Sequence, residues 1–201
     1  MIRYRFINNQ ILGLYSQLPS IKFPLDVYGL IDYIPNCRYM SYQEFAVLNK
    51  CSIEDVIQIC ESKSGCTHYD ILHNRYLILS NRSEIDNNNA GRQRWTCGHE
   101  IGHVVCNHLP TSAYSKLSEN NLLIISDSEY ESEADYFAAT LLAPFPLYET
   151  LGIKSSNDIR AKFGLSNEAS FNQYKHFLSW KKNRVKTAWE NDLKKMFKLK
   201  G

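Results

Sequence analysis

The pentapeptide His99-Glu100-Ile101-Gly102-His103 constrains the fold of this chain more than any other segment. Its two histidines are four residues apart, and on an α-helix this spacing leaves only about 40° of rotation between them, so both rings project from one face. Two imidazoles held in this way can chelate one Zn²⁺, while Glu100 would face a water at the open coordination position. The pattern therefore requires a helix, and it requires a third ligand from elsewhere in the chain.

A second helix, predicted over residues 128–142, offers that ligand. On this helix Glu131 and Asp135 lie on the same face, one turn apart. Glu131 is the candidate third ligand, and Asp135 is the candidate group that orients a ligand histidine. Glu133 is the competing ligand, although it projects to the opposite side of the helix.

Small side chains form a stripe on each of these two helices. Gly98 and Gly102 are four residues apart, and so are Ala134 and Ala138. Glycine inside a helix costs about 1 kcal/mol relative to alanine, so two glycines within one motif indicate that another backbone packs close by. We expect that backbone to be the helix that carries Glu131.

The remaining chain predicts an α+β fold with few strands. A pair of helices is expected over 41–61 with a break near 49–52, where Ser52 can cap the second helix with Asp55 three residues on. The first forty residues, interrupted by three prolines, show no clear periodicity. A β-hairpin is predicted from 66–72 and 76–80, and helices are predicted over 93–108, 157–163, 167–180 and 189–197.

Two parts of the chain differ in charge. Residues 181–201 carry eight basic and two acidic side chains, although the whole chain has a formal net charge of only +2. We place a main domain at 1–150 and a helical, basic extension at 151–201. Apolar residues alternate with the charges near the end, which indicates an amphipathic helix. We expect it to contact a partner protein, and we do not expect direct nucleic-acid binding.

Six irregularly spaced cysteines include no CxxC pair, and no apolar run is long enough to cross a bilayer or to serve as a signal peptide. We expect free thiols, no membrane association and a cytoplasmic location. Cys106 lies one turn after His103 and is expected to be a buried thiol, whereas His108 projects away from His103 and is not expected to be a ligand.

Two blocks of this sequence resemble one family. Residues 92–103, RQRWTCGHEIGH, resemble the "RqRFTlAHElGH" signature of the ImmA/IrrE-type metallopeptidases, and residues 131–144 resemble that family's "ExxAxxFAxxLLxP" block. Trp95, Cys97, Gly98 and Ala143 depart from the family pattern, but none of them is a ligand position.

The resemblance implies a zincin-like core, in which a small antiparallel sheet packs on the HExxH helix and a second ligand helix. It also implies that His99, His103 and Glu131 bind Zn²⁺, that Glu100 is the catalytic acid and base, and that the protein is a cytoplasmic endopeptidase. Members of this family typically cut a helix-turn-helix transcriptional repressor of a mobile element or stress response.

Several alternatives stay open at this point. The chain could be a non-proteolytic metal-binding regulatory or toxin-like interaction protein. If the strand at 76–80 forms the sheet edge beside the cleft, an extended substrate could pair with it. Tyr130, Tyr136 and His73 are candidates for stabilising the oxyanion of the reaction.

Overall fold

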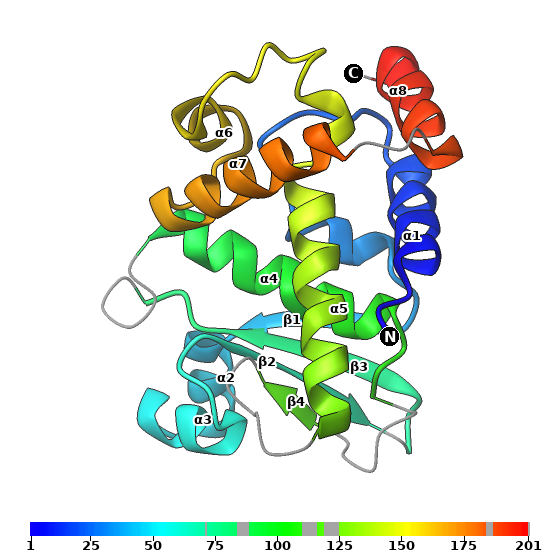
Figure 1. Cartoon of the computed structure of the whole chain (residues 1–201). Coiled ribbons are helices and arrows are strands. Elements are labelled where there is room, and N and C mark those ends of the chain that lie inside the picture. Colours follow the sequence, from blue (N-terminus) through cyan, green and yellow to red (C-terminus); the bar gives the residue numbers. More distant parts are fainter. Residues whose placement is uncertain (71, 84–88, 110–115, 119–124, 184–186, 201) are drawn as a thin grey trace.

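The structure, a computed structural model, describes residues 1–70, 72–83, 89–109, 116–118, 125–183 and 187–200. Helices and a small sheet alternate along the chain, which confirms the expected α+β class (Figure 1). The elements in order are α1 (Tyr4–Gln17), η1 (Gly29–Tyr33), β1 (Cys37–Ser41), α2 (Tyr42–Asn49), α3 (Ile53–Cys60), β2 (Gly65–Asp70), β3 (Arg75–Ser80), α4 (Ala90–Val105), β4 (Lys116–Ser118), α5 (Ile125–Leu142), η2 (Phe145–Leu147), α6 (Ser156–Phe163), α7 (Asn167–Lys182) and α8 (Ala188–Lys200).

The four strands form one mixed sheet in the order β1-β3-β2-β4. The predicted hairpin is confirmed, because β2 and β3 pair antiparallel from Gly65↔Ser80 to Asp70↔Arg75. The expectation of a wholly antiparallel sheet is wrong, since β1 runs parallel to β3. Strand β3 is also not the sheet edge, because it lies between β1 and β2. Its side chains explain this position: Ile78 and Leu79 are both buried, on opposite faces of the sheet.

Helices α2 and α3 cover one face of the sheet and begin where the sequence predicts. Ser52 accepts a hydrogen bond from the backbone N–H of Asp55, while the Asp55 carboxylate accepts one from the backbone N–H of Ser52, so α3 has a complete capping box. Ser41 and Glu44 form the same arrangement at the start of α2. Together with Leu79 of β3, these helices enclose a small separate apolar cluster.

Helix α4 lies across the other face of the sheet, and α5 crosses α4 (Figure 1). Ile101 of α4 is fully buried in the main core, as are Phe137 and Leu141 of α5. Helix α1, which the sequence analysis missed, packs on α5 and buries Ile7 and Ile11. The sheet and α5 therefore hold α4 between them, and the HExxH segment lies inside the protein.

The C-terminal part is helical, as expected, and belongs to the same core as the rest of the chain. Phe163, Phe177 and Leu193 are buried in the main core, and the ring of Phe197 stacks on Phe23 at a centroid distance of 6.2 Å. Much of the apolar side of α8 thus packs on this chain itself. The expectation that the extension contacts a partner protein stays a prediction. The domain division at residue 150 stays a prediction.

All six cysteines are free thiols, as expected, and four of them are buried. Among the helices of the described residues, none combines the length and the apolar character that crossing a membrane requires.

Candidate metal centre

Helix α4 places the two histidines of the motif side by side in the interior. Their Nε2 atoms lie 3.0 Å apart, and the side chains are buried. Because the residues are one helical turn apart, their rings meet edge to face, with centroids 4.8 Å apart.

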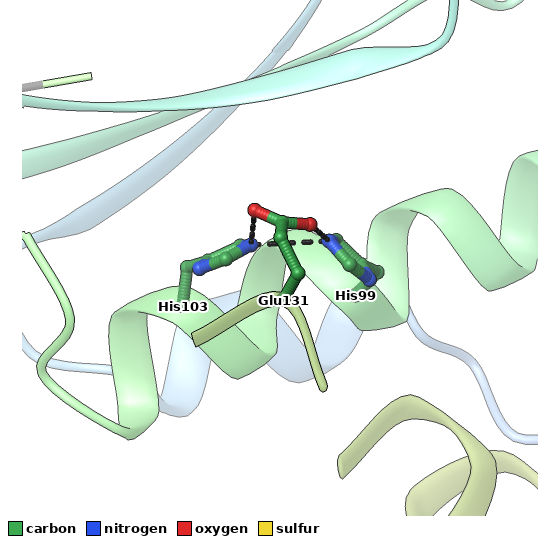
Figure 2. Close-up of side chains that lie close together, drawn as sticks. All are labelled: His99, His103 and Glu131. Atoms are coloured by element: carbon green, nitrogen blue, oxygen red, sulfur yellow. Dashed lines mark hydrogen bonds and ion pairs between the residues drawn. The ribbon is translucent and has the colours of Figure 1, made fainter. Parts of the chain in front are cut away.

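Helix α5 brings Glu131 over both rings, and the carboxylate bridges the two imidazoles in Figure 2. Its Oε2 lies 3.0 Å from Nε2 of His99, and its Oε1 lies 3.3 Å from Nε2 of His103. Ligand atoms of the three residues all lie within 4.8 Å of one another, although the chain places α4 and α5 far apart in sequence.

The glycine and alanine stripes account for this close approach. A Cβ atom on Gly102 would lie 3.0 Å from Cα of Ala134, and one on Gly98 would lie 3.6 Å from Cβ of Ala138. Carbon atoms in van der Waals contact are about 3.5–4.0 Å apart, so a side chain at position 102 would push α5 away. The predicted packing of the two helices along these stripes is confirmed.

Glu133 lies on the other side of α5, as its helical position predicts. It forms an ion pair with Arg3 at 2.5 Å and lies 3.1 Å from Nε2 of His108. The structure therefore brings Glu131, and not Glu133, to the two motif histidines. Glu133, His108 and Cys106 form a second buried group of side chains that could hold a metal.

Hydrogen bonds at the far nitrogen atoms turn the Nε2 atoms toward Glu131. Nδ1 of His99 lies 3.0 Å from the carboxylate of Asp135, the partner that the sequence predicts, and Nδ1 of His103 lies 2.9 Å from Nδ1 of His108. The expectation that His108 projects away from His103 is wrong, because α4 ends at Val105 and His108 no longer follows the helix. An ionised carboxylate only accepts hydrogen bonds, so in the metal-free chain Nδ1 of His99 donates to Asp135 and Nε2 donates to Glu131. The hydrogen bond at Nδ1 would leave the lone pair of Nε2 for a metal ion that replaced the proton there.

The electrostatics of the cluster favour a cation. Burial by itself lowers the pKa of His99, but the hydrogen bonds to Asp135 and Glu131 outweigh it, so that pKa is raised well above its usual value. Burial lowers the pKa of His103. Burial would raise the pKa of Glu131, but the neighbouring imidazoles of His103 and His99 lower it to about 2. The carboxylates that favour a charged His99 would equally favour a bound cation.

The donor set fits a divalent metal ion. Ligand atoms around a tetrahedral ion, each about 2.0–2.1 Å from it, lie about 3.3 Å apart. The two Nε2 atoms are 3.0 Å apart, Nε2 of His99 is 3.0 Å from Oε2 of Glu131, and Nε2 of His103 is 3.3 Å from Oε1 of the same carboxylate, so all three separations are close to that spacing. Oε1 of Glu131 is also buried without a hydrogen-bond partner among the described residues. His99, His103 and Glu131 are therefore the residues that would hold a metal.

Glu100 is fully buried beside this cluster, on the side of α4 that faces the sheet. The hydroxyl of Thr67, in β2, donates to its Oε2 at 2.6 Å. A Cβ atom on Gly65 would lie only 2.6 Å from Cγ2 of Thr96, so the glycine allows β2 to approach α4. The sequence analysis missed Thr67, whose polar side chain in a buried strand was the available signal.

The three candidates for oxyanion stabilisation lie in different places. The hydroxyl of Tyr136 donates to Asn8 at 3.0 Å, and His73 pairs with Asp70 in the β2–β3 turn. Tyr130 stacks on the ring of His108, with centroids 4.7 Å apart. None of these contacts involves an atom of the metal cluster, and the oxyanion role of each residue stays a prediction.

The sequence matches the family model described as IrrE N-terminal-like domain, of the M78 peptidases, over residues 57–171. No curated protein matches the sequence significantly. The matched segment is more than half of the chain, and it contains both motif histidines, Glu100, Glu131 and Asp135. On this match, the chain belongs to the ImmA/IrrE-type metallopeptidase family.

Proposed function

We propose that the chain is a zinc-dependent endopeptidase with a zincin-like core, which hydrolyses a peptide bond in a protein substrate. The observation that carries the proposal is the buried cluster of His99, His103 and Glu131, with the carboxylate of Glu100 beside it. Two imidazoles and one carboxylate are a ligand set that leaves a fourth position open, as catalytic zinc sites do.

Zinc, when bound, would polarise the carbonyl of the scissile peptide and lower the pKa of water to about 7. The residues of this chain perform the proton transfers. Glu100 accepts the proton of the attacking water and returns it to the leaving amine. The hydrogen bond from Thr67, 2.6 Å long, holds the carboxylate of Glu100 in place between these two steps. Asp135 holds the ring of His99 through Nδ1.

A different strand from the one expected would hold the substrate. Strand β3 is interior, and among the strands of the described residues β4 (Lys116–Ser118) lies at the edge, paired with β2. Residue Thr67 of β2, which binds Glu100, is the neighbour of Leu117 in β4. An extended peptide that paired with the free side of β4 would therefore run along the edge nearest to the proposed catalytic groups.

We further propose that the substrate is a helix-turn-helix transcriptional repressor, cut in the cytoplasm without direct contact with nucleic acid or a membrane. The resemblance of residues 92–103 and 131–144 to the two family blocks supports this substrate class. Leu193 of the basic helix α8 is buried in the core of this chain, so the helix has a structural role that does not require a nucleic-acid partner.

The variant Glu100→Gln tests the proposal. It removes the proposed acid and base but leaves the three ligands. The variant should therefore keep one zinc ion per chain and no longer cleave a co-expressed repressor. Mass spectrometry of the repressor measures the cleavage. Undiminished cleavage, or loss of zinc, would count against this mechanism. Biological activity that persists without cleavage would instead support a non-proteolytic regulatory role.

A further inference from the structure

A row of four side chains leads from the proposed ligand His103 to the protein surface, through His108 and Glu133 to Arg3. We propose that Arg3, Glu133 and His108 are positioning residues, which fix the ring of His103 with the lone pair of Nε2 directed at the metal. The inference rests on the proposed function insofar as it takes His103 to be a metal ligand. The hydrogen bonds themselves do not depend on that assignment.

The outer end of the row is an arginine–carboxylate pair with several contacts. Nε of Arg3 donates to both oxygens of Glu133 at 3.0 Å, and Nη2 donates to Oε2 at 2.5 Å. The backbone N–H of Arg3 donates to Oε1 at 2.8 Å, and Nη2 also donates to the carbonyl oxygen of Cys106 at 3.2 Å. These bonds fix the position of the carboxylate and keep it ionised.

The negative charge of Glu133 determines which ring nitrogen of His108 and of His103 carries a proton. An ionised carboxylate can only accept, so Nε2 of His108 must donate to Glu133 across their 3.1 Å separation. A neutral imidazole then has a lone pair on Nδ1, which accepts the proton of Nδ1 of His103 at 2.9 Å. With its proton on Nδ1, His103 has a lone pair on Nε2, which accepts from Nε2 of His99 at 3.0 Å in the metal-free chain and would bind a metal.

We call the hydrogen-bonded row His103–His108–Glu133–Arg3 the relay. The backbone after α4 places His108 between His103 and Glu133. Asn107 adopts a left-handed conformation with φ of 57°, and the backbone N–H of His108 donates to the carbonyl oxygen of His103 at 3.1 Å. The ring of His108 stacks on Tyr130 with an interplanar angle of 22°. The turn and the stacking together hold the ring against His103.

The two proposed histidine ligands differ in how they reach an orienting carboxylate. His99 reaches Asp135 directly, and the Asp135 side chain is 61% exposed. His103 is fully buried, and its Nδ1 faces His108 rather than a carboxylate. His108 therefore connects the buried His103 to Glu133, and Arg3 binds the Glu133 carboxylate at the protein surface.

The same region has a competing interpretation as a second metal site, because Cys106, His108 and Glu133 lie close together. Two observations favour the relay. Arg3 already supplies a positive charge at the Glu133 carboxylate, and His108 uses both ring nitrogens within the row.

The first test reads the tautomers directly in the metal-free protein, by long-range ¹H–¹⁵N spectra of ¹⁵N-histidine-labelled samples at pH 7.5. The relay predicts that His103 carries its proton on Nδ1 and that His108 carries its proton on Nε2. A proton on Nε2 of His103, or on both nitrogens of His108, would overturn the proposal. Because no metal is present, this result is independent of whether the chain binds zinc or cleaves a substrate.

The second test measures the zinc dissociation constant by competition with a chromophoric chelator. Changes in the groups that orient metal ligands typically weaken metal affinity by about 10-fold to 100-fold, which we expect for His108→Phe. His108→Asn should recover part of this loss, because its amide oxygen can accept from Nδ1 of His103. Arg3→Gln should weaken affinity in the same direction, and Arg3→Lys less.

Arg5→Gln is the matched control for Arg3→Gln, because it removes the same charge from an exposed position two residues on, in the first turn of α1, whose N-cap residue is Arg3. Equal zinc affinities in Arg3→Gln and Arg5→Gln, or no recovery in His108→Asn, would overturn the relay. Two zinc ions per chain in the wild type would also overturn it, in favour of a second metal site. If His108→Phe does not fold, the partly exposed Arg3 still permits the comparison.

Discussion

Replacing Gly102 with alanine tests how the packing of α4 on α5 affects the metal site, because it changes the distance between the two helices and none of the proposed ligands. A Cβ atom at position 102 would lie 3.0 Å from Cα of Ala134, 3.2 Å from Cδ1 of Phe137 and 3.3 Å from the carbonyl oxygen of Ala134. Two of these atoms belong to the backbone, so α5 must recede by about 0.5 Å to restore normal carbon contacts. Glu131, one turn before Ala134, would move with it.

The same substitution at Gly98 is the control, because it gains the same helix propensity on the same helix. There the nearest atom is Cδ1 of Leu142 at 3.2 Å, the end of a side chain that can move. Alanine gains about 1 kcal/mol over glycine in a helix, while overpacking costs about 1–3 kcal/mol. We expect Gly98→Ala to be about 0.5–1 kcal/mol more stable than the wild type and Gly102→Ala to be about 0–2 kcal/mol less stable.

Urea denaturation of the metal-free proteins measures both free energies of unfolding, and chelator competition measures the zinc affinity. Gly102→Ala should bind zinc more weakly than Gly98→Ala. Equal stability and equal zinc affinity in the two variants would refute the argument that Gly102 sets the distance between α4 and α5.

Two further predictions concern other contacts. Gly91→Ala should destabilise the protein by more than about 3 kcal/mol in urea denaturation, since its Cβ atom would lie 2.5 Å from the carbonyl carbon of Leu165; wild-type stability would contradict this. Burial raises the pKa of Glu133, but hydrogen bonds from Arg3 outweigh it and lower that pKa from 4.5 to about 2. Its contribution to stability is therefore present above pH 4.5 and lost as the pH falls toward 2, so the stability difference between wild type and Glu133→Gln should narrow over that range; a constant difference would contradict the pairing.

The local periodicity of the sequence was enough to predict the motif helix and the helix that carries Glu131. Because the angular position of a residue on a helix follows from its number, the choice of Glu131 over Glu133 for the position beside the histidines required no tertiary information. The capping box of Ser52 and Asp55 and the β2–β3 hairpin are local in the same sense.

Contacts between distant segments were not predictable in this way. The parallel pairing of β1 with β3 joins Cys37 to Tyr76 across two helices and a strand, and no local pattern specifies it. Arg3 and Glu133 are 130 residues apart, so their pairing appears only in the folded chain. Helix α1 had a usable signal in Ile7, Ile11 and Leu14, but the prolines that follow it obscured the pattern.

The zinc content of purified variants distinguishes Glu131 from Glu133 as the third ligand. We predict one zinc ion per chain in the wild type, none in Glu131→Gln, and one in Glu129→Gln, which changes an exposed carboxylate on the same helix. Glu133→Gln should still bind one ion, with weaker affinity. A zinc ion that stayed in Glu131→Gln with wild-type affinity and left in Glu133→Gln would contradict the site described for this protein.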